Sequence, residues 1–291
     1  MSFSYSKVST FWDCPFKYKL IYIDKLKAKD NNNPDNPLFT GTAIHEGIEK
    51  KSITAAIENY KSNFNELGKR HDLEILKIQT ILKNAIDQIP RGEYEYELLG
   101  DDGFTGFIDC LVKVDEGIYD VLDFKHSNNT EGYKESPQVL LYKYYFEKLT
   151  GFKVRNMYYV FIPKYTKKLS ESFSEDEYES ILSDIKENYS KSNIIFVKVE
   201  YDEDKVKAFM TKKRLMEIAK TYEKKSGFGC KWCEFRKYCA SNGKDKSELK
   251  DNDVDIKVVN KPTPMESLFW GELWILKRIL KCIAMCLGLQ M

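Results

Sequence analysis

Two short apolar segments on either side of a three-residue turn lie near the middle of the chain, and they constrain its fold more than any other stretch. Residues 106–114 read Gly-Phe-Ile-Asp-Cys-Leu-Val-Lys-Val, and residues 118–126 read Ile-Tyr-Asp-Val-Leu-Asp-Phe-Lys-His. β-Branched and aromatic runs flanking a turn predict an antiparallel β-hairpin. Asp109 is early in the first strand and Asp123 late in the second, so we expect both carboxylates at the same end of the hairpin.

Side chains alternate along a strand, so Asp123 and Lys125 share one face, about 6.6 Å apart, while Asp120 points the other way. Two carboxylates beside a lysine predict a Mg²⁺ or Mn²⁺ site for phosphodiester hydrolysis, in which the lysine orients the attacking water. The alternative is a charged hairpin whose acids lie in solvent. Asp and Lys are depleted in strands, and here they interrupt an apolar run, which favours the metal site.

The whole chain has 291 residues, 42% of them hydrophobic, which is enough for one large domain with a sizeable core. Its net charge of +1 does not by itself indicate a nucleic-acid partner. The N-terminal residues contain no apolar signal segment, so we expect a cytoplasmic protein. Its seven cysteines are then expected as thiols or metal ligands rather than disulfides.

The regions around the hairpin predict alternating helices and strands. We expect helices on both sides of Cys14-Pro15 and then over residues 41–60, 63–90, 136–146, 175–190 and 202–224, and strands over 93–98, 154–162 and 194–199. His45 falls in the first turns of the helix at 41–60, where it is either structural or a metal ligand. In the strand at 93–98 three glutamates share one side, and either Glu95 or Glu97 could reach the hairpin site.

The helix after the hairpin carries Gln138 and Tyr142 one turn apart on one face. An apolar helix with tyrosines is ordinarily part of the core. Because this helix directly follows the Asp-Phe-Lys strand, the pair could also contact DNA or support the site residues.

A second cluster of reactive residues is Cys230-x₂-Cys233-x₅-Cys239, which supplies three thiolates within ten residues. A [4Fe–4S] cluster or a Cys₄ zinc site needs a fourth. Cys14 is the best candidate, and Cys110, Cys282 and Cys286 are less suitable. Such a site would join the N-terminal segment to the C-terminal one.

The C-terminal region changes composition twice. Residues 244–264 are polar and aperiodic, as in a linker. Residues 265–291 are strongly apolar, but charges interrupt the run and it is too short to predict a membrane span. We expect this helical tail to dock on the main domain or on a protein partner, in preference to a membrane surface.

Five short motifs in one order resemble the PD-(D/E)XK nuclease superfamily, in particular its RecB-like exonuclease branch. The motifs are His45, Gly106-x-x-Asp109, Asp123-x-Lys125, Gln138-x₃-Tyr142 and the cysteine set. The cysteine set is similar to that of the iron–sulfur members, which include CRISPR-associated RecB-type exonucleases and AddB-type nuclease domains. The resemblance covers about residues 3–245.

This resemblance implies an α/β fold of the restriction-endonuclease-like kind, with a central mixed β-sheet flanked by helices. It implies that residues 1–243 form the nuclease domain. A Mg²⁺ or Mn²⁺ ion would be held by His45, Asp109, Asp123 and the Phe124 carbonyl, with Lys125 positioning the nucleophilic water. Gln138 and Tyr142 would lie at the DNA groove. The cysteines implied to bind a [4Fe–4S] cluster, with zinc as the alternative, are Cys14, Cys230, Cys233 and Cys239.

The function implied is a metal-dependent DNA exonuclease in recombination, repair or DNA processing, acting on single strands or free ends. The alternative is a catalytically idle DNA-binding or scaffold subunit stabilised by zinc or a cluster. The complete set Asp109, Asp123 and Lys125 favours the enzyme, because a scaffold has no physical need for it. An iron–sulfur electron carrier is less favoured for the same reason.

Overall fold

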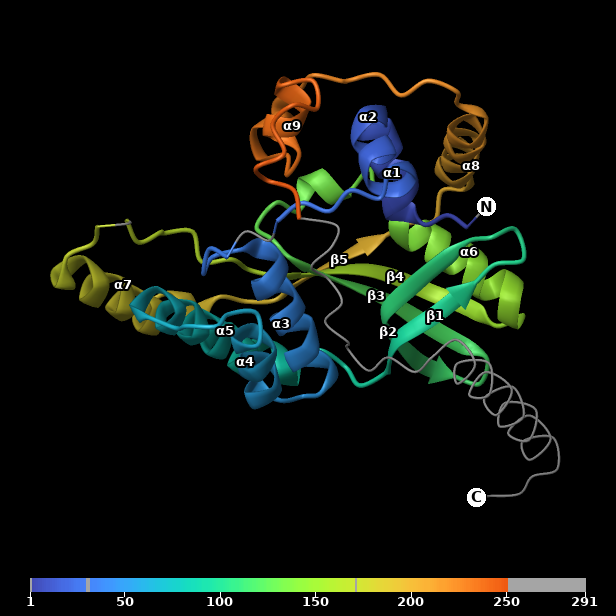
Figure 1. Cartoon of the computed structure of the whole chain (residues 1–291). Helices are drawn as coiled ribbons and strands as arrows, with labels where there is room; N and C mark the ends of the chain where they lie inside the picture. The colour runs from blue at the N-terminus through green and yellow to red at the C-terminus, as the bar shows by residue number, and fades with distance from the viewer. Residues whose placement is uncertain (1, 30–31, 171, 251–291) are drawn as a thin grey trace, which may run out of the picture.

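The computed structural model describes residues 2–29, 32–170 and 172–250. Its centre is a five-stranded sheet with the strands in sequence order (Figure 1). β3 and β4 are parallel, whereas the other neighbouring pairs are antiparallel, so the sheet is mixed, as the sequence predicts. The strands are β1 (Glu93–Leu99), β2 (Thr105–Asp115), β3 (Ile118–His126), β4 (Lys153–Ile162) and β5 (Ile195–Val199).

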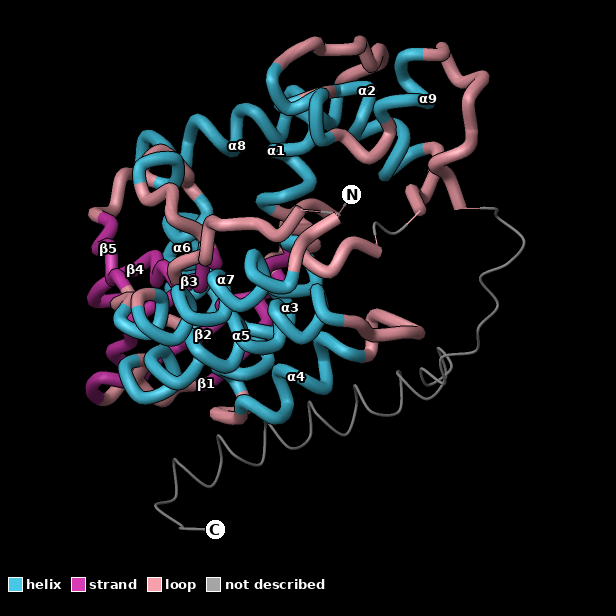
Figure 2. The backbone as a smooth tube through the Cα atoms, turned by 90° about the vertical axis from the view of Figure 1, so that its left-hand side faces the viewer, coloured by secondary structure: helices cyan, strands magenta, loops and turns pink. Residues whose placement is uncertain are grey.

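Helices cover both faces of this sheet, and α1, α2, α8 and α9 gather at one end of the molecule in both Figure 1 and Figure 2. The α-helices are α1 (Tyr5–Asp13), α2 (Pro15–Tyr18), α3 (Pro37–Glu49), α4 (Ile53–Lys61), α5 (Lys69–Gln88), α6 (Gln138–Thr150), α7 (Glu175–Glu187), α8 (Glu203–Ile218) and α9 (Arg236–Ala240). Shorter helical turns are η1 (Lys19–Ile23), η2 (Glu131–Tyr133), η3 (Tyr189–Lys191) and η4 (Phe228–Trp232). The α/β class and the restriction-endonuclease-like layering are confirmed.

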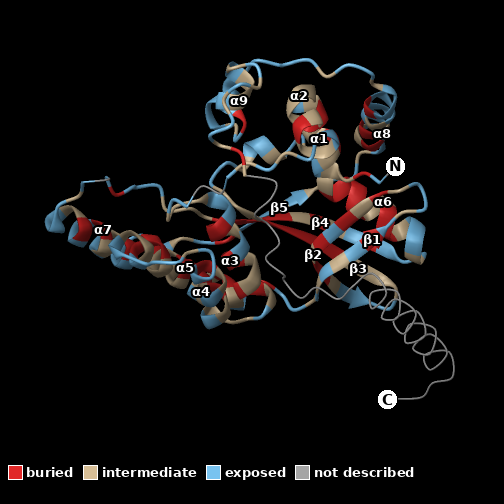
Figure 3. Cartoon of the chain, viewed as in Figure 1, coloured by how far each residue is buried: buried red, intermediate tan, exposed pale blue. Residues whose placement is uncertain are grey.

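The two faces of the sheet belong to two hydrophobic cores (Figure 3). Leu122 and Phe124 of β3 pack with α3, α4, α5 and α7, which form the first core. Val121 of β3 packs in the second core, with α1, α6 and α8. Neighbouring residues of β3 thus face opposite layers, as a pleated strand buried on both sides requires.

α6 crosses from the end of β3 to the start of β4, because two parallel strands cannot be joined by a tight turn. The helix follows Pro137 and ends at Thr150. The next residue, Gly151, caps it with φ of +74°, a left-handed conformation that glycine adopts without a Cβ clash. This crossover brings the first turn of α6 close to the side chains at the end of β3.

Three of the expected helices differ most from the observed ones. The single helix expected over 41–60 is wrong. Instead α3 begins at Pro37, where the Asn36 side chain accepts a hydrogen bond from the Leu38 N–H at 3.0 Å. The chain then turns at Lys51, with φ of +50°, and α4 starts after its own cap. The helix expected from residue 63 begins at residue 69, and the helix expected to reach residue 224 ends at 218.

The expected linker over 244–264 is described as far as residue 250. Its first part pairs with the N-terminal region, since the Lys29 N–H donates to the Glu248 carbonyl at 2.7 Å and Leu249 is buried. The expected apolar tail at 265–291, with Cys282 and Cys286, lies outside the described residues. In the described part of the chain, no helix has the length and apolar character needed to cross a membrane.

Candidate active site

Asp109 and Asp123 occupy neighbouring positions on β2 and β3. Cys110 pairs with Leu122, so the next step of the same register sets the two aspartates opposite each other. The Phe124 N–H donates a hydrogen bond to Asp109 Oδ2 at 2.5 Å. The Asp123 side chain is only 1% exposed. The hairpin therefore brings both carboxylates to one end, as its sequence predicts.

Lys125 lies beside Asp123, with 2.5 Å between Lys125 Nζ and Asp123 Oδ2. The same ammonium group donates a hydrogen bond to Gln138 Oε1 at 3.1 Å, and Gln138 Nε2 donates to the Tyr142 hydroxyl at 2.8 Å. Tyr142 is 6% exposed, and its described contacts are inside the protein. These contacts connect Gln138 and Tyr142 to the position of Lys125, whereas a DNA contact for the pair stays a prediction.

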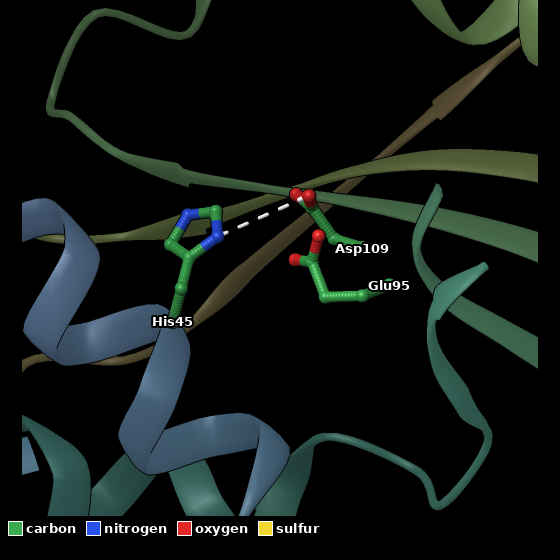
Figure 4. Close-up of side chains that lie close together, drawn as sticks. All are labelled: His45, Glu95 and Asp109. Atoms are coloured by element: carbon green, nitrogen blue, oxygen red, sulfur yellow. Dashed lines mark ion pairs between the residues drawn. The ribbon is translucent and has the colours of Figure 1, made fainter. Parts of the chain in front are cut away.

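His45 reaches this region from α3. Its Nδ1 atom lies 3.9 Å from Asp109 Oδ1, and its ring packs edge-on against Phe124, with 5.7 Å between the ring centroids. Figure 4 shows the imidazole and the Asp109 carboxylate facing each other, with the Glu95 carboxylate beside them. One ligand atom from each of these three side chains lies within 4.8 Å of the other two. Of the two glutamates left open by the sequence, the structure therefore selects Glu95.

The described residue group that could hold a metal ion differs in part from the expected one. It contains His45 and Asp109 as expected, and it has Glu95 where the resemblance implies Asp123. Asp123 instead makes its close contact with Lys125. For Phe124, the described contacts are its N–H to Asp109 and its ring against His45, and the role of its carbonyl as a ligand stays a prediction.

The backbone at Glu95 departs from a regular strand. Tyr94 pairs with Cys110 and Tyr96 pairs with Ile108, which sets Glu95 opposite Asp109, yet this position makes no ladder pair. Glu95 has φ of +50°, a conformation that costs a residue with a Cβ about 1–2 kcal/mol. Such strain persists only where the surrounding structure imposes it, and it is frequent at functional sites.

At this irregularity the side chains of β1 and β2 change the core that they face. Tyr96 and Ile108 contact the second core, whereas Tyr94 and Cys110, each two residues away on the same strand, contact the first. In an unbroken strand, residues two apart share a face. Both strands therefore change face at the level of Glu95 and Asp109, where the candidate ligands lie.

The electrostatics of the cluster favour a bound cation. Burial raises the pKa of Asp109 to about 7, and burial together with the charge of Asp109 raises the pKa of Asp123 to about 7. Burial also raises the pKa of Glu95 and lowers that of His45, which keeps the imidazole neutral. Burial opposes the charge on Lys125, but the attraction of Asp123 outweighs it and the pKa is raised. One ammonium group faces several crowded carboxyls, and a divalent cation would relieve their repulsion.

Asp120 has no part in this cluster. It lies on β3 out of phase with Asp123, and both of its carboxylate oxygens bind Arg155, at 3.1 and 2.6 Å. Cys110 packs in the first core, away from the other cysteines of the described chain. The position of Asp120 agrees with the alternation expected from the sequence.

The cysteine-rich segment lies beside the N-terminal helices, with α9 next to α2 in Figures 1 and 2. The Phe16 N–H donates to the Glu223 carbonyl at 3.1 Å, and Lys17 Nζ lies 2.9 Å from Glu234 Oε2. A small core joins the two segments, formed by Leu20, Phe235 and Leu249 with Phe16 and Cys233 packed against it. The structure therefore brings the segment of Cys14 next to the segment of the other three cysteines.

The five cysteines of the described residues are free thiols. Within those residues, no three of the sulfur atoms lie within 4.8 Å of one another. Tetrahedral zinc with Zn–S bonds of about 2.3 Å would need closer sulfurs, about 3.8 Å apart. The thiol set has the right chemistry for a metal centre, and its geometry in this structure is more open than a zinc site.

A mixed sheet that gathers two aspartates and a lysine at one end of a hairpin is the arrangement expected of a nuclease. The chain belongs to the PD-(D/E)XK nuclease superfamily, because the model of that family matches residues 2–240. This chain is similar to a solved crystal structure from Eubacterium rectale, which is provisionally named an exonuclease. The match covers 92% of each chain, with 11% sequence identity and a TM-score of 0.49. The curated proteins contain no match.

Proposed function

We propose that this nuclease is a metal-dependent DNA exonuclease that acts in recombination, repair or DNA processing. The observation that supports it most is the convergence of His45, Glu95 and Asp109 next to the buried Asp123–Lys125 pair. Membership of the nuclease superfamily supports DNA as the substrate. The exonuclease assignment follows from the likeness of those motifs to the RecB-like branch.

The donor set fits a Mg²⁺ or Mn²⁺ ion. Carboxylate oxygens are the ligands that both ions prefer, and the neutral His45 nitrogen can serve Mn²⁺. We assign the holding of the ion to His45, Asp109 and Asp123, with Glu95 as a further carboxylate that the sequence pattern does not single out. When bound, the ion would lower the pKa of a water molecule and stabilise negative charge on the phosphate.

Lys125 has the position of the group that orients the attacking water. Its ammonium is held between Asp123 and Gln138, so its direction is fixed by two contacts rather than by solvent. The raised pKa keeps Lys125 protonated, which makes it a donor to water or phosphate oxygens rather than a base. Gln138 and Tyr142 act on the reaction through the orientation of Lys125.

For the cysteines we propose a [4Fe–4S] cluster held by Cys14, Cys230, Cys233 and Cys239, with zinc as the alternative. The support is the four-thiol donor set and the packing of its two segments against each other. When bound, the cluster would fix the N-terminal helices to the C-terminal segment, and its binding energy would contribute to folding.

Protein purified without oxygen and incubated with linear and covalently closed circular DNA tests the proposal. In Mg²⁺ or Mn²⁺ we expect end-labelled linear DNA to lose its label and give short products, while closed circles remain intact. Asp123→Asn should abolish cleavage, and Asp120→Asn serves as the control because Asp120 lies outside the cluster. Cleavage of closed circles would show an endonuclease, and no cleavage with either metal would favour the idle scaffold subunit.

A further inference from the structure

The turn η4 presents two large aromatic side chains to solvent. Phe228 is 82% exposed, the highest value among the large apolar residues of the described chain that stand out as exposed, and Trp232 is 63% exposed. Their rings contact each other edge to face, with 4.7 Å between centroids. An exposed aromatic pair costs solubility, and such patches usually mark a binding surface.

This aromatic pair lies in the most basic part of the C-terminal segment. Residues 220–237 contain six lysine or arginine residues and two glutamates, although the whole chain has a net charge of only +1. Lys231 Nζ lies 5.2 Å from the centre of the Trp232 ring. The ammonium group of Lys224 donates to the Cys239 carbonyl, and that of Lys225 donates to the Trp12 carbonyl. Because a carbonyl is neutral, both lysines keep their full positive charge. The local charge therefore suits an anionic partner.

The segment that carries the pair is held in place. Lys225 Nζ donates to the Trp12 carbonyl at 2.8 Å, and the Lys17–Glu234 ion pair and the small core around Phe235 fix the segment from its other side. Exposed rings on an anchored segment are already arranged for contact, so binding need not order them first.

We propose that Phe228 and Trp232 form a base-stacking platform for single-stranded nucleic acid, with Lys231 and its neighbouring lysines contacting the phosphates. Aromatic rings interleaved with lysines bind single strands because every base has a face that stacks and every linkage carries a negative charge. Paired bases in a duplex are already stacked and cannot use such a platform. The inference rests on the proposed function for the nature of the substrate, and it adds that the strand is unpaired where it crosses η4.

The test measures the binding of the full chain to a fluorescent oligothymidylate of about 20 nucleotides, long enough to cover a typical single-strand site, in buffer without divalent metal. Replacing both Phe228→Ala and Trp232→Ala should weaken binding about ten- to a hundred-fold. The pair Phe228→Tyr with Trp232→Phe should retain most of the affinity, because both rings remain. Leu99→Ala, which truncates a 59% exposed leucine on β1, is the matched control and should bind as the parent does.

An abasic oligonucleotide of the same length separates stacking from charge. On this ligand the double alanine variant and the parent should bind equally, since no base is present. If the double alanine variant binds both ligands equally weakly, the substitutions have a general structural effect and the stacking proposal is wrong. If the variant binds oligothymidylate as tightly as the parent does, the proposal is also wrong, and the exposed rings would instead fit a protein partner. Cleavage by the metal site is measured separately. If the parent protein cleaves DNA but the alanine substitutions do not change binding, only this inference is rejected. If the substitutions weaken binding but the parent protein does not cleave DNA, only the proposed function is rejected.

Discussion

Glu95 lies opposite Asp109 on the neighbouring strand, at a level where the β1–β2 ladder makes no pair and where both strands change the core that they face. The backbone of Glu95 is in a left-handed conformation, and its carboxylate lies beside the Asp109 carboxylate and the His45 ring. The geometry of the candidate metal ligands and the backbone strain therefore have the same origin.

Two substitutions at Glu95 should separate these effects. Glu95→Gln keeps the strained backbone and removes the charge, whereas Glu95→Gly removes the charge and relieves the strain by about 1 kcal/mol. We expect both to weaken Mn²⁺ binding, measured by titration calorimetry, and we expect Glu95→Gly to have the higher Tm of the two. A lower Tm for Glu95→Gly, or Mn²⁺ affinity equal to that of the parent in both variants, would contradict the role given to Glu95.

Lys125→Met should reduce cleavage by about a hundred- to ten-thousand-fold, the range that a group positioned on a proton-transferring water contributes. It also leaves Asp123 without its nearest positive charge, so the Tm without metal should fall. Rates of product formation and thermal unfolding by circular dichroism measure the two effects. In the control, Asp120→Asn should lower the Tm through its broken contact with Arg155 and still cleave DNA. Full activity of Lys125→Met would remove Lys125 from the mechanism.

The pKa values of the aspartates predict how pH affects stability and metal binding. Both are raised from 3.8 to about 7, so in that interval the folded metal-free protein binds more protons than the unfolded chain, and its stability falls as pH rises. The lowered pKa values of His45 and His126 act in the opposite direction, whereas the raised pKa of Glu95 acts in the same direction as those of the aspartates. Above about pH 7 the aspartates are ionised and ready to bind a cation.

Mn²⁺ should therefore raise the Tm much more at pH 8 than at pH 5. Thermal unfolding with and without Mn²⁺ at both pH values measures this difference, and Asp109→Asn should reduce it. An equal increase in Tm at both pH values would show that these carboxyls do not exchange protons for the metal.

Protein purified without oxygen should be brown if the four cysteines hold an iron–sulfur cluster. Cys14→Ser should lose the colour and lower the Tm, because the two segments that pack around Leu20 and Phe235 would no longer share a metal centre. Cys110→Ser is the control for metal content, since Cys110 is buried in the first core. A colourless protein that contains one zinc ion would contradict the iron–sulfur cluster but support a four-cysteine metal centre. An unchanged metal content in Cys14→Ser would contradict a metal centre that includes Cys14.

Local patterns in the sequence predicted most of the fold and part of the site. The hairpin, the alternation that separates Asp120 from Asp123, and the helix after Pro137 depend on neighbouring residues, and the structure confirms each of them. The prediction failed where a helix over 41–60 was expected, because the cap at Ser52 and the turn at Lys51 stop a segment whose apolar spacing continues.

Only the tertiary structure decided which glutamate joins the site. Glu93, Glu95 and Glu97 alternate in one strand, and regular pleating gives all three the same face, so the sequence by itself left open whether Glu95 or Glu97 reaches the hairpin site. The choice depends on the backbone φ of Glu95 and on the change of face that β1 and β2 make together. Both are set by packing against two cores at once, which is a long-range effect that no local pattern contains.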